Sequence, residues 1–457
     1  VTVADAVTAA EGAAIATVTN AAASFTTGVV DALGNLSSGG TVNSNLNALA
    51  GDDTDVAIAI SDADNFAAEA ADLKVVGGAT TGTVTVTNQA AISGNIADVT
   101  AALITDASKV VLSKASTATV ADAVTVKQGG DIAGLANVTA TFTAGVNDSL
   151  TALLADGAAN IDKVVADHAS VAIAINDAAG HTPTAANLST IGGKTSGTVT
   201  VENAAAISGS VAEVTAALVT DLTKVVLGDA STVTVSGAVT AKQGADIANV
   251  AKATATFSNG VADTLDKLAA SGAITTDLTH LLGDDATVTI TINDAGPLKD
   301  VDAADLKAIG GATSGAVNVA NAAEIDGAAA EVTAALVDAE TKVVLDTAST
   351  VSVSDAVTAK QGADIADVAD ATVTYSGGVA DAMTSLYDTG SDVTTNLGKI
   401  LTESGAALAV TVNDASGTLL ATDLSGLQGH LKMQYSTCTS IRYGRRFNSI
   451  STYAYVF

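Results

Sequence analysis

The sequence has few aromatic residues and almost no cysteine, proline or tryptophan. Its 457 residues include one Cys, two Pro, two Met, six Phe, six Tyr and no Trp. A single Cys excludes a disulfide framework and a Cys-rich zinc or iron–sulfur site. The hydrophobic fraction is 48%, and such abundance of small apolar residues at low charge density argues against disorder.

Basic residues are also scarce, since 19 Lys and Arg face 49 Asp and Glu and the net charge is −30. Nucleic-acid-binding proteins carry a basic face, so this class is excluded. No run of about 18 apolar residues is uninterrupted, so the sequence predicts no membrane span. The chain starts at Val1 without a signal-peptide pattern, and we therefore expect a processed form or a fragment of a longer chain.

Internal repeats organise the sequence. The segment Ala-Val-Thr-x-Lys-Gln-Gly begins at Ala123, Ala238 and Ala356, and a weaker version begins at Ala6. An aromatic residue keeps the same interval of about 117 residues, at Phe25, Phe142, Phe257 and Tyr375. The predicted repeats cover residues 1–116, 117–231, 232–349 and, as a partial copy, 350–432, followed by an atypical tail at 433–457.

Within the third copy, runs in which Thr or a small residue alternates with Val, Ile or Phe have the period expected of half-buried strands. They predict strands over 232–235, 254–257, 287–292 and 316–319. Ala-rich stretches with an apolar face follow them. These predict helices over 240–250, 260–269, 303–309 and 328–337.

This alternation predicts an α/β fold, a right-handed strand–helix solenoid with a parallel sheet and about four coils in each repeat. A strand–helix–strand path makes the strands parallel and the crossovers right-handed, and the coil length resembles that of a leucine-rich repeat. The four aromatic residues at the repeat interval are expected to form one ladder with a ring in each copy; ordinary core packing is the alternative. Separate small α/β domains are the alternative, although no polar or Pro-rich linker divides the copies.

The tail at 433–457 departs from the repeat. It contains Cys438, three of the Arg residues and four of the six Tyr. This abrupt change of composition indicates a frame-shifted or wrongly assembled terminus. A native capping or anchoring segment is the alternative.

Catalytic residues are not evident. The four His residues do not share a position in the repeat: His168, His181, His280 and His430. No His-Glu-x-x-His, Gly-x-Ser-x-Gly or phosphate-loop motif occurs. The sequence therefore predicts that the protein is not an enzyme.

Calcium is the candidate cofactor, because Asp and Asn gather where the elements join and hard oxygen ligands on tight turns bind Ca²⁺. The weak candidate ligands occupy one position of the repeat: Asp62, Asp177, Asp294 and Asp414. Helix capping is the alternative role for these residues. A second set is expected in the first turn of a helix, where a carboxylate favours the helix dipole: Asp31, Asp148, Asp263 and Asp381.

Alternating threonines are a candidate binding surface. Thr83, Thr85 and Thr87 form one such run, and residues 287–292 form another. Stacked on a parallel sheet, these rows would make an exposed Thr ladder able to order water or bind ice. The simpler interpretation is that Thr suits the solvent-facing side of a strand.

The segments Asp305-Leu-Lys-Ala-Ile-Gly-Gly-Ala-Thr-Ser-Gly and Ala322-Ala-Glu-Ile-Asp-Gly resemble repeats in very large surface or extracellular proteins of marine cyanobacteria and other aquatic bacteria. The resemblance covers residues 1–432, and the composition is also similar to that of surface-layer proteins. It implies a secreted or cell-surface structural role and no catalytic residues.

Two functions are therefore expected. The first is an extracellular structural protein, the building block of a surface layer, sheath or filament. Its partner is another copy of itself, because an open strand edge at Val1 invites end-to-end stacking. The alternative is an adhesin or ligand-binding solenoid that grips a glycan, a surface or ice with a Thr-rich sheet face.

Overall fold

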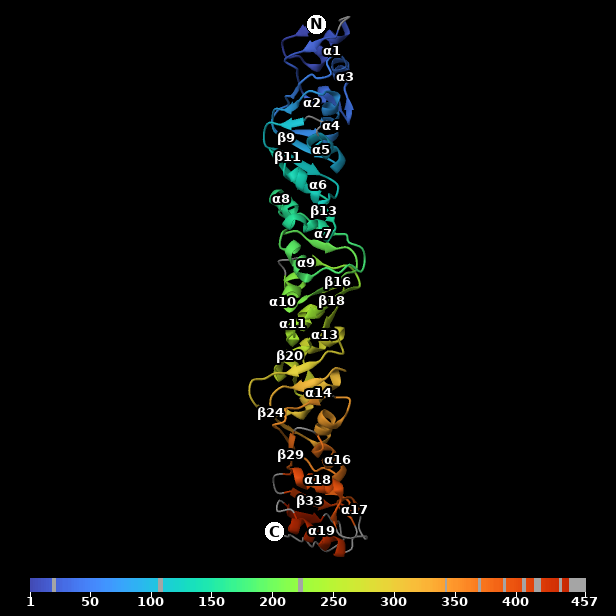
Figure 1. The fold of residues 1–457 in the computed structure, drawn as a ribbon, viewed down its shortest axis with the longest axis vertical. Helices are drawn as coiled ribbons and strands as arrows, with labels where there is room; N and C mark the ends of the chain where they lie inside the picture. The colour runs from blue at the N-terminus through green and yellow to red at the C-terminus, as the bar shows by residue number, and fades with distance from the viewer. Residues whose placement is uncertain are drawn as a thin grey trace. The chain divides into compact units, whose positions relative to one another are not determined.

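The computed structural model describes residues 1–18, 22–105, 110–220, 225–341, 343–368, 371–388, 392–404, 408–414, 421–434 and 438–443. The chain forms two compact units: unit 1 contains residues 1–232 and 251–253, and unit 2 contains residues 233–250 and 254–457. Both units are mixed α/β, with parallel sheets and helices that alternate with strands. Unit 1 begins in blue and unit 2 ends in red in Figure 1.

Unit 1 is built on parallel sheets. One has the order β10 (Val110–Leu112), β8 (Val84–Val86), β6 (Ile58–Ile60), β3 (Val29–Asp31). A second has the order β12 (Val138–Phe142), β11 (Ser116–Val120), β9 (Ala90–Gly94), β7 (Phe66–Glu69). A third has the order β13 (Val146–Asp148), β14 (Ile173–Ile175), β15 (Val199–Val201), β17 (Val225–Val226). Further strands are β1 (Thr2–Val3) beside β2 (Ser24–Phe25), the hairpin β4 (Ser37–Ser38) and β5 (Thr41–Val42), and β16 (Ala206–Ser210).

The helices of unit 1 follow these strands. They are α1 (Ala9–Val18), α2 (Leu33–Leu36), α3 (Ser44–Asp52), α4 (Ala70–Ala79), α5 (Ile96–Leu103), α6 (Val126–Ala133), α7 (Leu150–Leu153), η2 (Ala155–Ala158), α8 (Ala159–Asp167), α9 (Ala185–Gly192), α10 (Val211–Val214) and the π-helical turn η3 (Thr215–Val219). Figure 1 shows α4 and α5 stacked on one another beside β9 and β11.

Unit 2 repeats this arrangement. One sheet has the order β20 (Val261–Asp263), β23 (Ile290–Ile292), β25 (Val317–Val319), β27 (Val343–Val344). A second has the order β24 (Leu298–Asp302), β26 (Ala323–Gly327), β28 (Ser349–Val353), β29 (Ala371–Tyr375). A third has the order β30 (Val379–Asp381), β33 (Leu408–Val412), β34 (Cys438–Tyr443). Its hairpins are β21 (Ala269–Ala270) with β22 (Ala273–Ile274) and β31 (Tyr387–Asp388) with β32 (Asp392–Val393). Strands β18 (Ser231–Ser236) and β19 (Ala253–Phe257) lie where the two units divide the chain.

The helices of unit 2 are α11 (Ala241–Ala248), α12 (Leu265–Leu268), α13 (Thr276–Asp284), α14 (Ala303–Ala312), α15 (Ala329–Val332), the π-helical turn η4 (Thr333–Val337), α16 (Ala359–Ala366), α17 (Met383–Leu386), α18 (Thr395–Glu403) and α19 (Ala421–Gln434). Equivalent elements recur along the chain, as α1 and α6 do in unit 1 and α11 and α16 do in unit 2. The four repeat boundaries themselves remain predictions.

Successive strands of the chain belong to two sheets in alternation. Ile58 lies beside Val84, and Val84 lies beside Val110, in the first sheet of unit 1. Ala91 lies beside Thr117 in the second sheet, which receives the intervening strands. One turn of the chain, which corresponds to one predicted coil, therefore contains two strands and a helix in this region. The expectation of one strand for each helix is wrong here.

In the third copy the predicted strands and helices can be compared with the elements of the structure. The strands predicted over 232–235, 254–257 and 316–319 and the helices predicted over 240–250, 303–309 and 328–337 are confirmed. The helix predicted over 260–269 is wrong, because β20 and the short α12 share that segment. Of the strand predicted over 287–292, only β23 forms.

The cores of both units are lined by aliphatic and small side chains. In β11 and β12 the inward residues Ala118 and Ala140 are fully buried beside one another. The predicted ladder positions are also buried, with exposed fractions of 3% for Phe25, 1% for Phe142, 3% for Phe257 and 4% for Tyr375. Small residues in register permit close stacking, and in each copy one buried aromatic ring lies at the last residue of its strand.

The repeated Thr-x-Lys-Gln segment begins a helix. Thr125 accepts the backbone N–H of Gln128, and the Gln128 side chain accepts the Thr125 N–H, which is a capping box at the start of α6. Thr240 and Gln243 form the same box at α11. The repeat signature is therefore a helix-start signal.

Most of the predicted atypical tail lies outside the described residues. Strand β34 pairs in parallel with β33, with Val410 beside Ile441 and Val412 beside Tyr443. Residues 435–437 and 444–457, which include Arg445 and Arg446, are among those not described. Whether the tail is an artefact or a native cap stays a prediction.

Candidate functional site

Carboxylates at the ends of strands cap helices that lie one turn earlier in the chain. Asp31 is the last residue of β3, and its Oδ2 accepts the N–H of Ala9, the first residue of α1, at 2.9 Å. Its Oδ1 accepts the N–H of Ala32 at 2.8 Å. The same bonds to a first helical residue and to the following residue are made by Asp148, Asp263 and Asp381.

The prediction that these four residues sit in the first turn of a helix is wrong. Each ends a strand, and the helix that it caps belongs to the preceding turn. The electrostatic argument still applies, since an anion favours the N–H groups and positive dipole end of any helix that it faces. The carboxylate therefore joins two turns, whereas an ordinary cap acts within one.

The four calcium candidates form a second row of such caps. Asp62 accepts the N–H of Leu33, the first residue of α2, at 2.7 Å. The equivalent bonds, at 2.7 to 2.9 Å, join Asp177 to Leu150, Asp294 to Leu265 and Asp414 to Met383. In the described part of the chain no group of three or more His, Cys, Asp or Glu is placed to hold a metal ion. Calcium binding at these residues stays a prediction.

A third row of acceptors holds the strands that end in the aromatic ladder. Asp53 accepts the N–H of Phe25 at 2.6 Å, and Asp285 accepts that of Phe257 at 3.0 Å. In the second copy His168 takes this place, its Nδ1 accepting the N–H of Phe142 at 3.3 Å. The preceding carboxylates each accept a second N–H, from a strand residue or from the residue just before the strand: Asp52 from Ala23, Asp167 from Ala140 and Asp284 from Ala255.

The fourth ladder residue is held differently. The Tyr375 hydroxyl donates to the carbonyl of Gly362 at 2.7 Å. Burial raises the pKa of Tyr375 well above its ordinary value, and the negative charges of Glu403 and Asp367 add to this shift. The ring is therefore a neutral hydrogen-bond donor inside the core.

Buried threonines tie the loop after a helix to the preceding turn. Thr195 is 4% exposed, donates to the carbonyl of Val171 at 2.7 Å and accepts the N–H of Gly197 at 2.9 Å. Thr80 and Thr313 make the same pair of bonds. A Cβ on Gly197 would lie 2.5 Å from the carbonyl oxygens of Ser170 and Val171, so only glycine fits there. The segments Gly-Gly-x-Thr-Ser-Gly at 192–197 and 310–315 and Gly-Gly-x-Thr-Thr-Gly at 77–82 thus encode an inter-turn contact.

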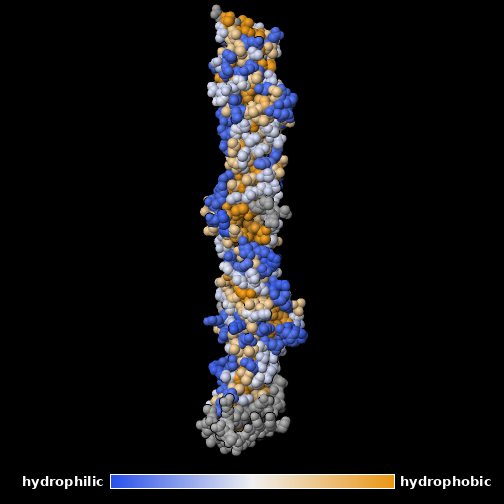
Figure 2. All heavy atoms as spheres, turned by 180° about the vertical axis from the view of Figure 1, so that it is seen from behind, coloured by the Kyte–Doolittle hydropathy of each residue, from blue (hydrophilic) through white to orange (hydrophobic). Residues whose placement is uncertain are grey.

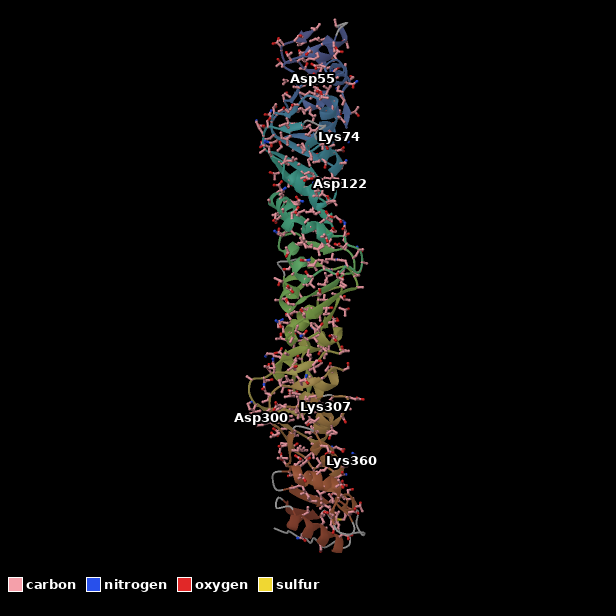
Figure 3. All side chains as sticks on the ribbon, in the orientation of Figure 1. Asp55, Lys74, Asp122, Asp300, Lys307 and Lys360 are labelled. Atoms are coloured by element: carbon pink, nitrogen blue, oxygen red, sulfur yellow. The ribbon has the colours of Figure 1, made fainter. Side chains whose placement is uncertain are left out.

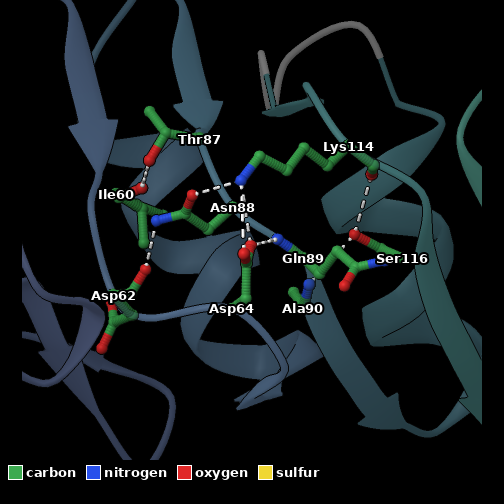
Figure 4. Close-up of polar contacts among 9 residues, drawn as sticks. All are labelled: Ile60, Asp62, Asp64, Thr87, Asn88, Gln89, Ala90, Lys114 and Ser116. Atoms are coloured by element: carbon green, nitrogen blue, oxygen red, sulfur yellow. Dashed lines mark hydrogen bonds and ion pairs between the residues drawn. The ribbon is translucent and has the colours of Figure 1, made fainter.

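Asp64, Asn88 and Lys114 form a polar cluster that the sequence analysis missed (Figure 4). Lys114 Nζ lies 3.0 Å from Asp64 Oδ1 and donates to Asn88 Oδ1 at 2.9 Å. The backbone N–H of Gln89 and the Lys114 ammonium lower the pKa of Asp64. The ion pair is half exposed, at 47% and 52%, so solvent screens it. The cluster joins the ends of successive strands, and an ammonium held by a carboxylate is a poor nucleophile.

Only the Asn of this cluster recurs. Asn88, Asn203 and Asn321 donate their side-chain amides to the carbonyls of Asp62, Asp177 and Asp294 at 2.6 to 2.8 Å. The three histidines whose side chains are described lie apart. His181 bonds to the carbonyl of Ala178, and His280 contacts Asn249. The side chains of His430 and Cys438 lie outside the described residues.

The predicted Thr ladder is not where the sequence placed it. Thr85 lies between Ala59 and Val111, and Thr291 lies between Ala262 and Asn318. Matching threonines do occur on another sheet, where Thr117 lies beside Thr139 and Thr119 beside Thr141, all four exposed. Unit 2 has a related pair, Thr350 beside Thr372.

Hydrophilic residues form blue areas on the visible face of both units in Figure 2. Asp122, labelled in Figure 3, is a further cap, because it accepts the N–H of Ile96 at the start of α5 at 3.2 Å. The arrangement thus distributes carboxylates along the chain as acceptors of backbone N–H groups.

Comparison with protein-family models finds no match, and comparison with curated proteins finds none. No helix among the described residues is long and apolar enough to cross a membrane.

Proposed function

We propose that the protein is an extracellular structural protein, a building block of a surface layer, sheath or filament. The observation that carries the proposal is the set of acceptors that join each turn to the next, above all Asp31, Asp148, Asp263 and Asp381. In this proposal the turns form a right-handed solenoid, similar to leucine-rich repeats, whose stiffness comes from these caps and from parallel strand pairing.

Three features support this role. Carboxylate caps recur at one position of all four copies and buried hydroxyls at one position of the first three, as expected when copies share one mechanical task. The net charge of −30 keeps a long apolar-cored assembly solvated. The resemblance of residues 1–432 to surface proteins of marine cyanobacteria and other aquatic bacteria supports a location outside the cell.

Assembly follows from the direction of the caps. Asp31 reaches back to Ala9, and Asp62 reaches back to Leu33, so a later turn supplies the cap of an earlier one. A turn without a following turn presents uncapped N–H groups and an open strand edge, which favour pairing. We therefore propose head-to-tail association of copies, with no catalytic role.

The second candidate is an adhesin or ligand-binding solenoid. The exposed pairs Thr117 with Thr139 and Thr119 with Thr141 favour it, because parallel pairing spaces their hydroxyls by about 4.8 Å across strands. Glycan, a mineral or polymer surface, or ice would be its ligand. Saturable binding that is lost in a Thr119→Ala, Thr141→Ala double variant would support this function.

Electron microscopy of native material, with and without a chelator, tests the leading proposal. Filaments, sheets or a surface lattice are the expected result. Loss of that order on chelation would make calcium part of the assembly, and its persistence would assign the Asp62 row to capping alone. Compact monomers at every concentration would contradict the proposal.

A further inference from the structure

One inter-turn acceptor differs in kind from its equivalents. In the first and third copies a carboxylate oxygen accepts the N–H of the ladder phenylalanine, Asp53 for Phe25 and Asp285 for Phe257. In the second copy the acceptor is His168 Nδ1, which lies 3.3 Å from the Phe142 nitrogen. The bond requires a neutral imidazole with its proton on Nε2, because Nδ1 must offer a lone pair.

Protonation affects the two kinds of acceptor differently. A carboxyl group retains an acceptor oxygen whether it is ionised or protonated, whereas both nitrogens of a protonated imidazole are donors. Histidine is also the side chain whose charge ordinarily changes between pH 5 and pH 8. If the His168 ring is protonated in this range, its Nδ1–H faces the Phe142 N–H and their hydrogen bond is lost. The carboxylates of Asp53 and Asp285 still accept the N–H groups of Phe25 and Phe257.

We propose that His168 is a pH-sensitive joint in unit 1, at which protonation of the ring releases the Phe142 N–H and loosens β12 from the end of α8. His168 follows the last residue of α8, and its carbonyl accepts the N–H of Val171 ahead of β14. Phe142 is 1% exposed. The joint thus connects a buried ring, a helix end and the start of the next strand.

The groups around the ring allow this change. On α8 itself, Asp167 directly precedes the ring, and its carboxylate accepts the Ala140 N–H at 2.7 Å. Strand β12 carries no charged residue. The other charged residues on α8 and on the elements packed against it are Asp162 and Lys163 on α8, Lys127 and Asp131 on α6, and Asp156 on η2. Lys127 pairs with Asp131 at 2.7 Å, and Asp162 pairs with Lys194 at 2.6 Å, so these pairs add little net charge.

Amide hydrogen exchange of the whole chain tests the joint, because the chain contains its own controls. After correction for intrinsic exchange rates, we expect protection of the Phe142 amide to fall about five- to tenfold between pH 7.5 and pH 5.0, as loss of one hydrogen bond implies. The Phe25 and Phe257 amides, held by carboxylates, should keep their protection in the same sample.

The matched variant is His168→Asp, which gives the second copy the acceptor used by the first and third. The Phe142 amide of this variant should stay protected at both pH values. If His168→Asp does not fold, His168→Asn replaces it, because its side-chain oxygen accepts at any pH and should also keep the Phe142 amide protected. Unchanged protection of Phe142 in the wild-type chain would overturn the proposal. An equal fall in His168→Asp, or a parallel fall at all three phenylalanine amides, would overturn it too.

Discussion

Replacement of Asp31 tests whether the carboxylates join the turns. Its side chain is 8% exposed and accepts three donors: the N–H groups of Ala9 and Ala32 and the side-chain amide of Asn35. In Asp31→Ala all three lose their acceptor, and in Asp31→Asn one oxygen remains to accept while the amide nitrogen faces a donor. The isosteric variant therefore separates lost bonds from lost volume.

A hydrogen bond to a charged acceptor contributes about 1.5–3 kcal/mol, and two of the three donors are backbone groups at or beside helix starts. Water replaces part of what is lost, so we expect about 3 kcal/mol of local destabilisation for Asp31→Ala and about 1.5 kcal/mol for Asp31→Asn. At about 1.4 kcal/mol for each factor of ten, the first value corresponds to a roughly hundredfold loss of protection at the Ala9 amide.

Hydrogen exchange at Ala9 is the suitable assay, since repeat arrays open locally and a single unfolding free energy is not well defined for them. The control is Asp55→Asn, which changes an exposed carboxylate of the same unit (Figure 3) and should alter protection by less than about 0.5 kcal/mol. If Asp31→Ala changes Ala9 protection no more than Asp55→Asn does, the caps do not hold the turns together.

Three further predictions concern the core, the buried hydroxyls and the surface. Phe257→Ala should lower the local stability around Phe257 by about 3–5 kcal/mol, measured by hydrogen exchange of the neighbouring amides, because it empties a site that is 3% exposed; a loss below about 1 kcal/mol would contradict the ladder. Thr195→Val should lower local stability in the same assay by about 1–3 kcal/mol, since Val171 O and Gly197 N lose their partner, whereas Ser196→Ala nearby should have a smaller effect. The Lys74 hydrogen bond lowers the pKa of Asp98, so Asp98 stabilises the fold above its unfolded-state pKa and this contribution is lost as pH falls through the folded value; Lys74→Ala should raise the pKa of Asp98 in an NMR titration, and an unchanged midpoint would exclude the ion pair.

Repetition made much of the fold predictable from sequence. Period-two runs identified β18, β19 and β25, and Ala-rich amphipathic stretches identified α11 and α14. One strand in several turns was missed, β26 for example, because its segment 323–327 carries Glu324 and Asp326 at outward positions, which resemble loop residues. Short strands with charged outer faces are hard to distinguish from turns without their partners.

For Asp62 and its equivalents the sequence left two roles open, calcium binding and helix capping, and the capping role is confirmed. The helix that each residue caps was not predicted, because the N–H partners are 27 to 31 residues away. No local pattern reveals a donor at that distance. A signal was present in the constant interval between the N-cap threonine of each copy and its strand-ending aspartate: Thr8 and Asp31, Thr125 and Asp148, Thr240 and Asp263, Thr358 and Asp381.

Electron microscopy of the native material is the most direct test of the central claim, that stacked turns build an extracellular assembly. We expect filaments, sheaths or a lattice at the cell surface whose subunits associate end to end. We also expect Asp31→Ala and Asp263→Ala, which remove inter-turn caps, to weaken that order, while Asp55→Asn leaves it intact. A dispersed, compact monomer in native samples would contradict the proposed assembly. An assembly whose order is unchanged when these caps are removed would contradict the role of the caps in it.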